Sequence, residues 1–268
     1  MNKQIYFFRS LTIALGFILT ITGGYAQDEK FTPQSGQAGK DVVWVPTPQE
    51  LVDAMLELAK VTSADYVIDL GSGDGRLVIT AAKRGAKALG IEYNPDMVEL
   101  ARNFAIDEGV SARATFKKAD LFESDFSEAT VITMFLLSSI NLKLRPIILD
   151  MKPGTRIVSN TFDMSDWKPD ETKHLTDNNV SWTTAHLWIV PAKVGGVWKL
   201  ADGQINITQE FQFITGTMTV GNETMRLTGK LDGNKINFNA GGNEYNGTVS
   251  GNAISGTRTG GGSWKATR

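Results

Sequence analysis

The sequence predicts an α/β domain, with helices on both faces of a parallel sheet, followed by a small all-β domain. Between residues 47 and 190, short apolar runs alternate with amphipathic helical segments, which is typical of a parallel sheet covered on both faces. After Pro191 the chain becomes rich in Gly, Asn and Thr and shows no helical periodicity. Its 268 residues, of which 41% are hydrophobic and 21% charged, have the composition of a globular protein.

The elements of the first domain follow from turn signals and apolar spacing. In the stretch TPQE, Thr47 is expected to cap the first helix and Pro48 to occupy its first position, and Leu51, Met55 and Leu58 follow at helical spacing. Strands are then expected at 66–70, 88–92, 114–118, 130–136, 155–160 and 183–190, and further helices at 76–84, 95–108 and 142–151.

The second domain is expected to be a small antiparallel meander. Ile205, Ile207, Phe211 and Phe213 alternate with polar neighbours, the period of a half-buried strand. The stretch GKLDGNKI is echoed by GTVSGNAI, and the DG and GN pairs are hairpin signals. The stretches GVWK and GSWK, near the two ends of this region, also match. We therefore predict six to eight strands over residues 195–268, closed into a barrel by pairing of the ends.

The N-terminus has the parts of a secretory signal. Lys3 and Arg9 precede an apolar run at 11–21, and small residues end at Ala26. This predicts a signal peptide over 1–26, a flexible leader over 27–44, and export to the periplasm or outside the cell, with no membrane span in the mature chain. The alternative is an uncleaved N-terminus that tethers the chain to a membrane. The absence of cysteine excludes a lipoprotein anchor and disulfides.

Charge and histidine content narrow the classes of partner. The mature chain has 25 Lys and Arg against 29 Asp and Glu, so bulk attraction to nucleic acid is not expected. His174 and His186 are the two histidines, and neither has partners at metal-ligand spacing. No metal site is therefore expected.

The stretch DLGSGDGR lies between a predicted strand and a predicted helix. A dinucleotide-binding loop has the pattern Gly-x-Gly-x-x-Gly, whereas here the third glycine comes one residue early, at Gly75, and Arg76 takes its place. A Walker A loop is excluded because no Gly-Lys-Ser/Thr follows. Asp69, at the end of the strand, would face a pyrophosphate badly but suits a cationic ammonium group.

Residues 67–75 resemble motif I of the class I S-adenosylmethionine (SAM) dependent methyltransferases, and the resemblance covers roughly residues 45–190. It implies a Rossmann-like methyltransferase domain over 45–192 with SAM as the cofactor. Asp69 with the loop glycines would hold the amino-acid end of SAM, Glu92 the ribose hydroxyls, and Asp120 the adenine amino group. The full set of expected cofactor-binding residues is Thr47, Asp69, Gly71, Ser72, Gly73, Gly75, Glu92, Tyr93, Asp120 and Leu121.

A narrower resemblance concerns the acceptor. The stretch VPTP, the stretch DLGSGDGR, and Phe162 followed by Trp167 are similar to the lysine methyltransferases of mitochondrial ATP synthase and the adenine nucleotide carrier. The stretch MKPGTRIVS looks like the matching strand of the non-SET histone-lysine enzymes. The resemblance implies methyl transfer to an amine, such as a lysine of an envelope protein. The stretch TMFLLSS departs from the polar motifs that orient an amine in many such enzymes.

Three candidates for the acceptor side follow, and alternatives for the function stay open. Phe135 is expected either in the wall of the acceptor site or in the core at a strand end, and Asp163 and Asp166 either line the acceptor cleft or are solvated. The expected function is SAM-dependent transfer of a methyl group to an amine. The alternatives are an exported binding module without catalysis and a methyltransferase acting on a small molecule.

Overall fold

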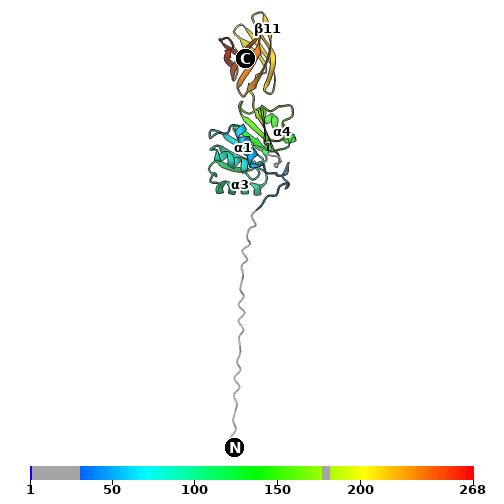
Figure 1. Cartoon of the computed structure of the whole chain (residues 1–268), viewed down its shortest axis with the longest axis vertical. Coiled ribbons are helices and arrows are strands. Elements are labelled where there is room, and N and C mark those ends of the chain that lie inside the picture. Colours follow the sequence, from blue (N-terminus) through cyan, green and yellow to red (C-terminus); the bar gives the residue numbers. More distant parts are fainter. Residues whose placement is uncertain (2–30, 177–181) are drawn as a thin grey trace. The chain divides into compact units, whose positions relative to one another are not determined.

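The computed structural model describes residue 1, residues 31–176 and residues 182–268 (Figure 1). The predicted signal peptide therefore lies outside the described residues, apart from Met1. All the helices and strands belong to one compact unit, Pro33–Arg268. In the described part of the chain, no helix is long and apolar enough to cross a membrane.

The first part of this unit is a seven-stranded sheet with the strand order β3-β2-β1-β4-β5-β7-β6. The first five strands in this order are parallel, whereas β7 runs antiparallel to both β5 and β6. The expectation of a wholly parallel sheet is thus wrong at one edge, where the short polar strand β6 was not predicted. The strands are β1 (Tyr66–Leu70), β2 (Lys87–Glu92), β3 (Ala114–Lys118), β4 (Val131–Met134), β5 (Arg156–Asn160), β6 (Glu171–His174) and β7 (Thr184–Ile189).

The helices begin where local sequence signals allow it. Pro48, not Thr47, is the N-cap residue of the first helix, whereas Asn94 caps the third, its side chain accepting a hydrogen bond from the Asp96 N–H. The fourth helix begins at Ser138, four residues earlier than predicted, and contains Pro146. The helices are α1 (Gln49–Leu58), α2 (Arg76–Lys83), α3 (Pro95–Asp107) and α4 (Ser138–Leu149), and a single 3-10 turn, η1, spans Leu121–Glu123.

Helices cover both faces of the sheet, as predicted. Successive residues of a strand point to opposite faces, so Val67 of β1 packs in one apolar cluster with α1, α2 and α3, whereas Ile68 packs in a second cluster with α4. Both side chains are almost completely buried. The two clusters fix the sheet between its helices and leave the carboxyl ends of the parallel strands to carry the loops.

The second part of the unit is a closed antiparallel barrel of eight strands (Figure 1). The last strand pairs with the first through Thr267 and Lys199, which confirms the predicted closure. Two-residue turns at 233–234 and 251–252 connect strands where the hairpin signals stand. The strands are β8 (Gly196–Leu200), β9 (Gly203–Glu210), β10 (Phe213–Val220), β11 (Glu223–Asp232), β12 (Lys235–Ala240), β13 (Asn243–Ser250), β14 (Ala253–Arg258) and β15 (Ser263–Thr267).

Aromatic residues fill the barrel, though not all those expected. Trp198 is fully buried, and the rings of Phe238 and Tyr245 stack at 4.8 Å between centroids. The predicted alternation breaks at the turn between β9 and β10, so that Phe213 is 48% exposed. Phe211 lies in that turn and stacks on Trp167 of the first part, with 5.8 Å between ring centroids.

Candidate functional site

The loop between β1 and α2 is shaped by glycines in the left-handed region. Gly73 has a φ of 52°, and a Cβ atom there would lie 2.6 Å from Nε1 of Trp44. Gly75 has a φ of 83°, and a Cβ atom there would lie 2.7 Å from the ring of Phe116. A side chain at either position would meet both backbone strain and a steric clash. Gly73 therefore permits close approach of Trp44 to the loop, and Gly75 permits close packing of α2 on the sheet.

A cavity of about 430 Å³ opens above the carboxyl ends of β1, β2 and β4. Ligand pockets have volumes of roughly 300–1,000 Å³ and lie at such topological switch points of open sheets. Gly75 is the one expected cofactor residue that does not line the cavity. The expected residues that line it are Thr47, Asp69, Gly71, Ser72, Gly73, Glu92, Tyr93, Asp120 and Leu121, together with Phe135 from the acceptor side.

Asp69 is a buried acid at the floor of this cavity. The residue is 3% exposed, and its side chain accepts a hydrogen bond of 2.7 Å from Oγ1 of Thr133 on the neighbouring strand. Burial raises the pKa of Asp69 to about 7, and the charge of Glu92 adds to the rise. A cationic group placed beside Asp69 would stabilise the carboxylate and lower this pKa.

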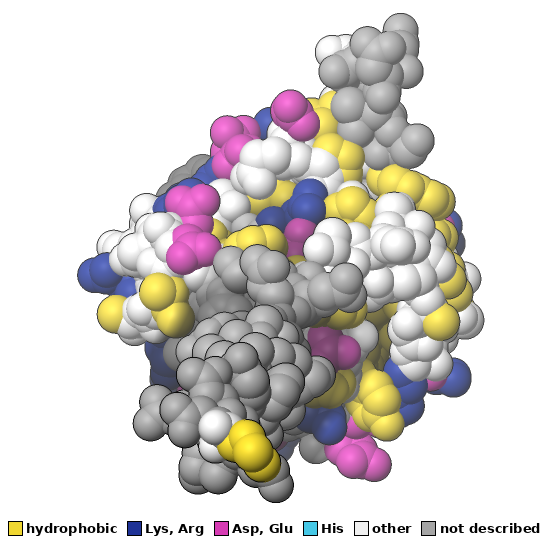
Figure 2. Space-filling view, turned by 90° about the horizontal axis from the view of Figure 1, so that it is seen from below, with side chains coloured by type: hydrophobic (Ala, Val, Ile, Leu, Met, Phe, Trp, Pro, Cys, Tyr) yellow, Lys and Arg dark blue, Asp and Glu magenta, His cyan; other side chains and the backbone are white. Residues whose placement is uncertain are grey.

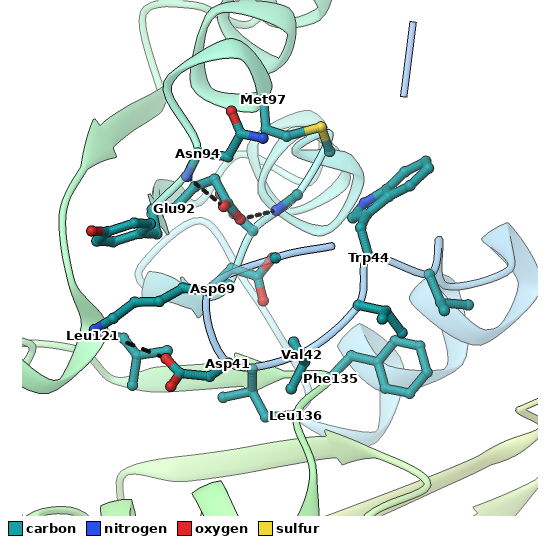
Figure 3. A pocket seen from close by; sticks show the side chains of 18 of the residues that line it. Asp41, Val42, Trp44, Asp69, Glu92, Asn94, Met97, Leu121, Phe135 and Leu136 are labelled. Carbon is teal, nitrogen blue, oxygen red and sulfur yellow. Dashed lines mark hydrogen bonds and ion pairs between the residues drawn. The ribbon is translucent and has the colours of Figure 1, made fainter. Parts of the chain in front are cut away.

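Glu92, at the end of β2, joins the glycine loop to the start of α3. Its Oε2 accepts a hydrogen bond of 3.0 Å from the Gly73 N–H, and its Oε1 accepts one of 2.9 Å from the Asn94 N–H. Figure 3 shows both bonds, with Asp69 between Glu92 and Phe135. Each carboxylate oxygen can accept a further hydrogen bond, so Glu92 is oriented and can still take two ligand hydroxyls.

Asp120 caps η1, where its Oδ1 accepts a hydrogen bond of 2.9 Å from the Phe122 N–H. Its Oδ2 accepts a hydrogen bond from the ammonium group of Lys40, which lowers the pKa of the Asp120 carboxyl. Nζ of Lys40 also lies 5.1 Å from the centre of the Tyr93 ring. A residue from the start of the described chain therefore contacts two of the expected cofactor-binding side chains.

Residues 37–47 form a strap that crosses the cavity, and most of them were assigned to a flexible leader from the sequence. Backbone hydrogen bonds fold this segment back on itself, from the Gly36 N–H to Trp44 and from the Trp44 N–H to Gln37. Arg76 at the start of α2 donates a hydrogen bond of 2.6 Å to the carbonyl of Thr47. Sequence reasoning missed the strap because polar, glycine-containing stretches are typical of linkers; Trp44 was the one available signal.

The acceptor side of the cavity is aromatic. Phe135 contacts Phe162 and Trp182, and all three residues line the cavity. Asp163 and Asp166 are exposed and do not line it, and Asp166 pairs instead with Arg145. Trp182 was missed from the sequence, because no local pattern distinguishes a tryptophan in a loop.

Ser72 offers a test of whether this cavity suits a cofactor. Among the described residues its hydroxyl oxygen is buried without a hydrogen-bond partner, and such buried groups are rare in native proteins unless a ligand or water satisfies them. The unpartnered hydroxyl, the buried acid Asp69 and the oriented carboxylate of Glu92 face one cavity. They fit a ligand with a cationic group and hydroxyls, which is the chemistry of SAM.

Comparisons with known proteins agree with this chemistry. Residues 69–171 match the family model of the ANTKMT methyltransferase domain. A protein-lysine N-methyltransferase of Saccharolobus islandicus is 45% identical over 152 residues, covering 56% of this chain and 94% of the relative. A human lysine N-methyltransferase named for ATP synthase is 31% identical over 144 residues, covering 53% of this chain and 60% of that relative.

A solved structure is also similar to this chain. An RNA methyltransferase from Salinibacter ruber, in complex with S-adenosyl-L-homocysteine (SAH), is 49% identical and has a TM-score of 0.53. It covers 56% of this chain and 96% of that one. The resemblance in fold and sequence thus extends to a protein that has been observed with the demethylated form of SAM.

Proposed function

This chain belongs to the family of SAM-dependent protein-lysine methyltransferases, and we propose that it methylates a lysine side chain of another protein. The observation that carries the proposal is the division of one cavity into an acidic half, with Asp69 and Glu92, and an aromatic half around Phe135. The acidic half suits the polar groups of the cofactor. The aromatic half suits the alkyl chain and amino group of a lysine.

Four groups of the chain are assigned to the cofactor in this proposal. The carboxylate of Asp69 would hold the ammonium group of SAM, and Glu92 would accept from both ribose hydroxyls. Asp120 would accept from the adenine amino group, and the orphaned hydroxyl of Ser72 would gain a partner. Adenine and Lys40 would then be neighbours on one carboxylate, since Lys40 already donates to Oδ2 of Asp120.

When bound, SAM supplies a methyl group that its sulfonium already activates. The lysine nitrogen must present a free electron pair to form the new N–C bond, while the electron pair of the broken C–S bond stays with sulfur. The displaced amine proton goes to water. The chain contributes by orienting the nitrogen and excluding water, and orientation of this kind can lower a barrier by roughly 7–11 kcal/mol. An apolar wall such as Phe135 also favours the neutral amine by lowering its pKa.

The charge of the chain favours a protein acceptor over RNA. The mature sequence has a net negative charge, whereas RNA binding depends on Lys and Arg that neutralise phosphates. On the face drawn in Figure 2, where grey atoms do not cover it, Lys and Arg side chains are interspersed with Asp and Glu and do not form one basic patch. The similar RNA methyltransferase makes RNA the alternative that the experiment must address.

The test supplies purified protein with SAM carrying an isotopically labelled methyl group. Total protein and total RNA from the source cells are offered separately, and both are analysed by mass spectrometry. The proposal expects labelled methyllysine in protein and no labelled nucleoside. The Asp69→Asn variant should lose the label, and Glu99→Gln, which changes an exposed acid of α3, should retain it. Label in RNA alone, or in small molecules alone, would overturn the proposal.

The place of the reaction is a separate proposal, which the sequence of the N-terminus supports. We propose that the chain is exported and cleaved after Ala26, so that the acceptor is a protein of the cell envelope. Mass spectrometry of the native protein should then find Gln27 at the N-terminus. A dominant peptide that spans residues 24–30 intact would favour the membrane tether.

A further inference from the structure

Three aromatic rings form a cluster at one end of the cavity, which we call the aromatic triad: Phe135, Phe162 and Trp182. We propose that the aromatic triad binds the alkylammonium group of the acceptor through cation–π contacts, so that the site selects its acceptor by charge as well as by shape. This inference rests on the proposed function, since it names the part of the cavity that receives the amine.

The topology brings the triad to the edge of the sheet that carries the acidic groups. Phe135 directly follows β4, Phe162 follows β5 by two residues, and Trp182 precedes β7 by two residues. Because β7 runs antiparallel to β5, its beginning lies beside the end of β5. Asp69 ends the run of β1 just before Leu70, and β1 pairs with β4. The triad and the acids therefore occupy neighbouring parts of one cavity.

The spacing of the rings suits a single cation. The ring centroids are 6.0 Å apart for Phe135 and Phe162, 5.6 Å for Phe135 and Trp182, and 5.8 Å for Phe162 and Trp182. A cation interacts favourably with a ring face when it lies within about 6 Å of the centroid. With centroids this close together, one ammonium group resting on the cluster can satisfy that distance to all three rings.

The rings of the triad have no cation of their own. Six Lys or Arg side chains of the described residues lie over aromatic rings, and every one of those rings is elsewhere, as in the pairs of Lys40 with Tyr93 and Arg145 with Phe211. The triad is thus the aromatic cluster of the cavity that can receive an external cation without displacing an internal one.

The backbone holds the triad in a strained and fixed geometry. Trp182 is 39% exposed and has a φ of 66°, and Thr161, next to Phe162, has a φ of 61°. Bulky or β-branched residues rarely adopt positive φ, and such outliers cluster at functional sites. The carbonyl of Phe162 accepts hydrogen bonds from Oγ of Ser159 at 2.7 Å and Nδ2 of Asn141 at 3.0 Å. Buried polar groups therefore fix the ring that joins the other two.

Choline and 3,3-dimethyl-1-butanol provide a direct test, because they share a shape and differ in charge. Each is titrated into the full chain saturated with SAH, and binding is followed by NMR of the probe. Choline should bind at least about fivefold more tightly than the neutral alcohol, as expected if the cation–π term dominates. Equal binding of the two compounds, or tighter binding of the alcohol, would overturn the cation site.

Variants assign the binding to the rings. Trp182→Leu and Phe162→Leu should each weaken choline binding by about fivefold or more while Trp182→Phe retains most of it. Phe104→Leu, which changes a 40% exposed ring on α3, is the matched control and should change nothing. SAH affinity, measured by calorimetry, should stay constant and show that the variants are folded. Choline binding that survives both leucine variants would overturn the assignment.

The methylation assay separates this inference from the proposed function. With a protein acceptor, Trp182→Leu should raise KM more than it lowers kcat, and Trp182→Phe should restore KM. Lysine methylation without discrimination between choline and the alcohol overturns the cation site alone. Absence of lysine methylation by the wild-type protein overturns the proposed function, and with it the role of the triad as an acceptor site.

Discussion

The ionisation of Asp69 should couple cofactor binding to the release of a proton. The pKa of this buried carboxyl is raised from 3.8 to about 7, so between about pH 4 and pH 7 the folded chain holds a proton that the unfolded chain has lost. The free energy of unfolding should therefore fall as the pH rises through this window. The total loss is about 4 kcal/mol, at about 1.4 kcal/mol for each unit of pKa shift.

The Asp69→Asn variant removes this titration with little change in shape. Its amide oxygen can still accept the hydrogen bond from Thr133, but the side chain cannot ionise. We expect the variant to be more stable than the wild type at pH 8, by up to about 4 kcal/mol, and to bind SAM more weakly. Denaturant unfolding at pH 4 and pH 8 measures the first effect.

Calorimetry at pH 6, in two buffers of different ionisation enthalpy, measures the proton directly. Asp69 of the free protein is then about 90% protonated, given its raised pKa. The ammonium group of SAM favours the carboxylate, so binding should release up to about 0.9 proton, and the Asp69→Asn variant should release none. Release below about 0.2 proton by the wild type would refute the assignment of Asp69 to the ammonium group.

Three further substitutions test other parts of the molecule. Glu92→Gln should weaken SAH binding by about 10- to 150-fold, from about 1.5–3 kcal/mol for hydrogen bonds to a charged group; unchanged calorimetric affinity would contradict its role. Lys40→Ala should raise SAH affinity by at most about fivefold, because it frees Asp120 from an exposed ion pair; a loss of affinity would show that Lys40 stays beside the cofactor. Trp198→Ala should cost about 3–5 kcal/mol of unfolding free energy in denaturant titrations, and a cost below about 1 kcal/mol would contradict its place in the barrel core.

The acidic half of the site could be predicted because each acid follows a recognisable strand. Asp69, Glu92 and Asp120 stand at or just after the ends of β1, β2 and β3, and parallel strands bring their carboxyl ends to one edge of a sheet. The strap and Trp182 could not be predicted in this way. Lys40 meets Asp120 across 80 residues of sequence, and no periodicity records such a contact.

The errors in the fold have equally local causes. β6 has the sequence ETKH and lies at the edge of the sheet, so it carries neither the apolar run nor the alternation that indicates a strand. The alternation Ile205, Ile207, Phe211, Phe213 was followed across a turn, where the register restarts. Period-two reasoning holds only within one strand.

The closure of the barrel has a consequence for the order in which the chain is made. The sheet has all its strands once residue 189 has been synthesised, whereas β8 waits for Thr267 of β15 before its free side is covered. Until then the growing barrel has two open edges, and unpaired strand edges template pairing with other chains. The last moments of synthesis are therefore the period in which this protein is most exposed to aggregation, and a ribosome stalled within β15 would release a chain with a finished sheet and an open barrel.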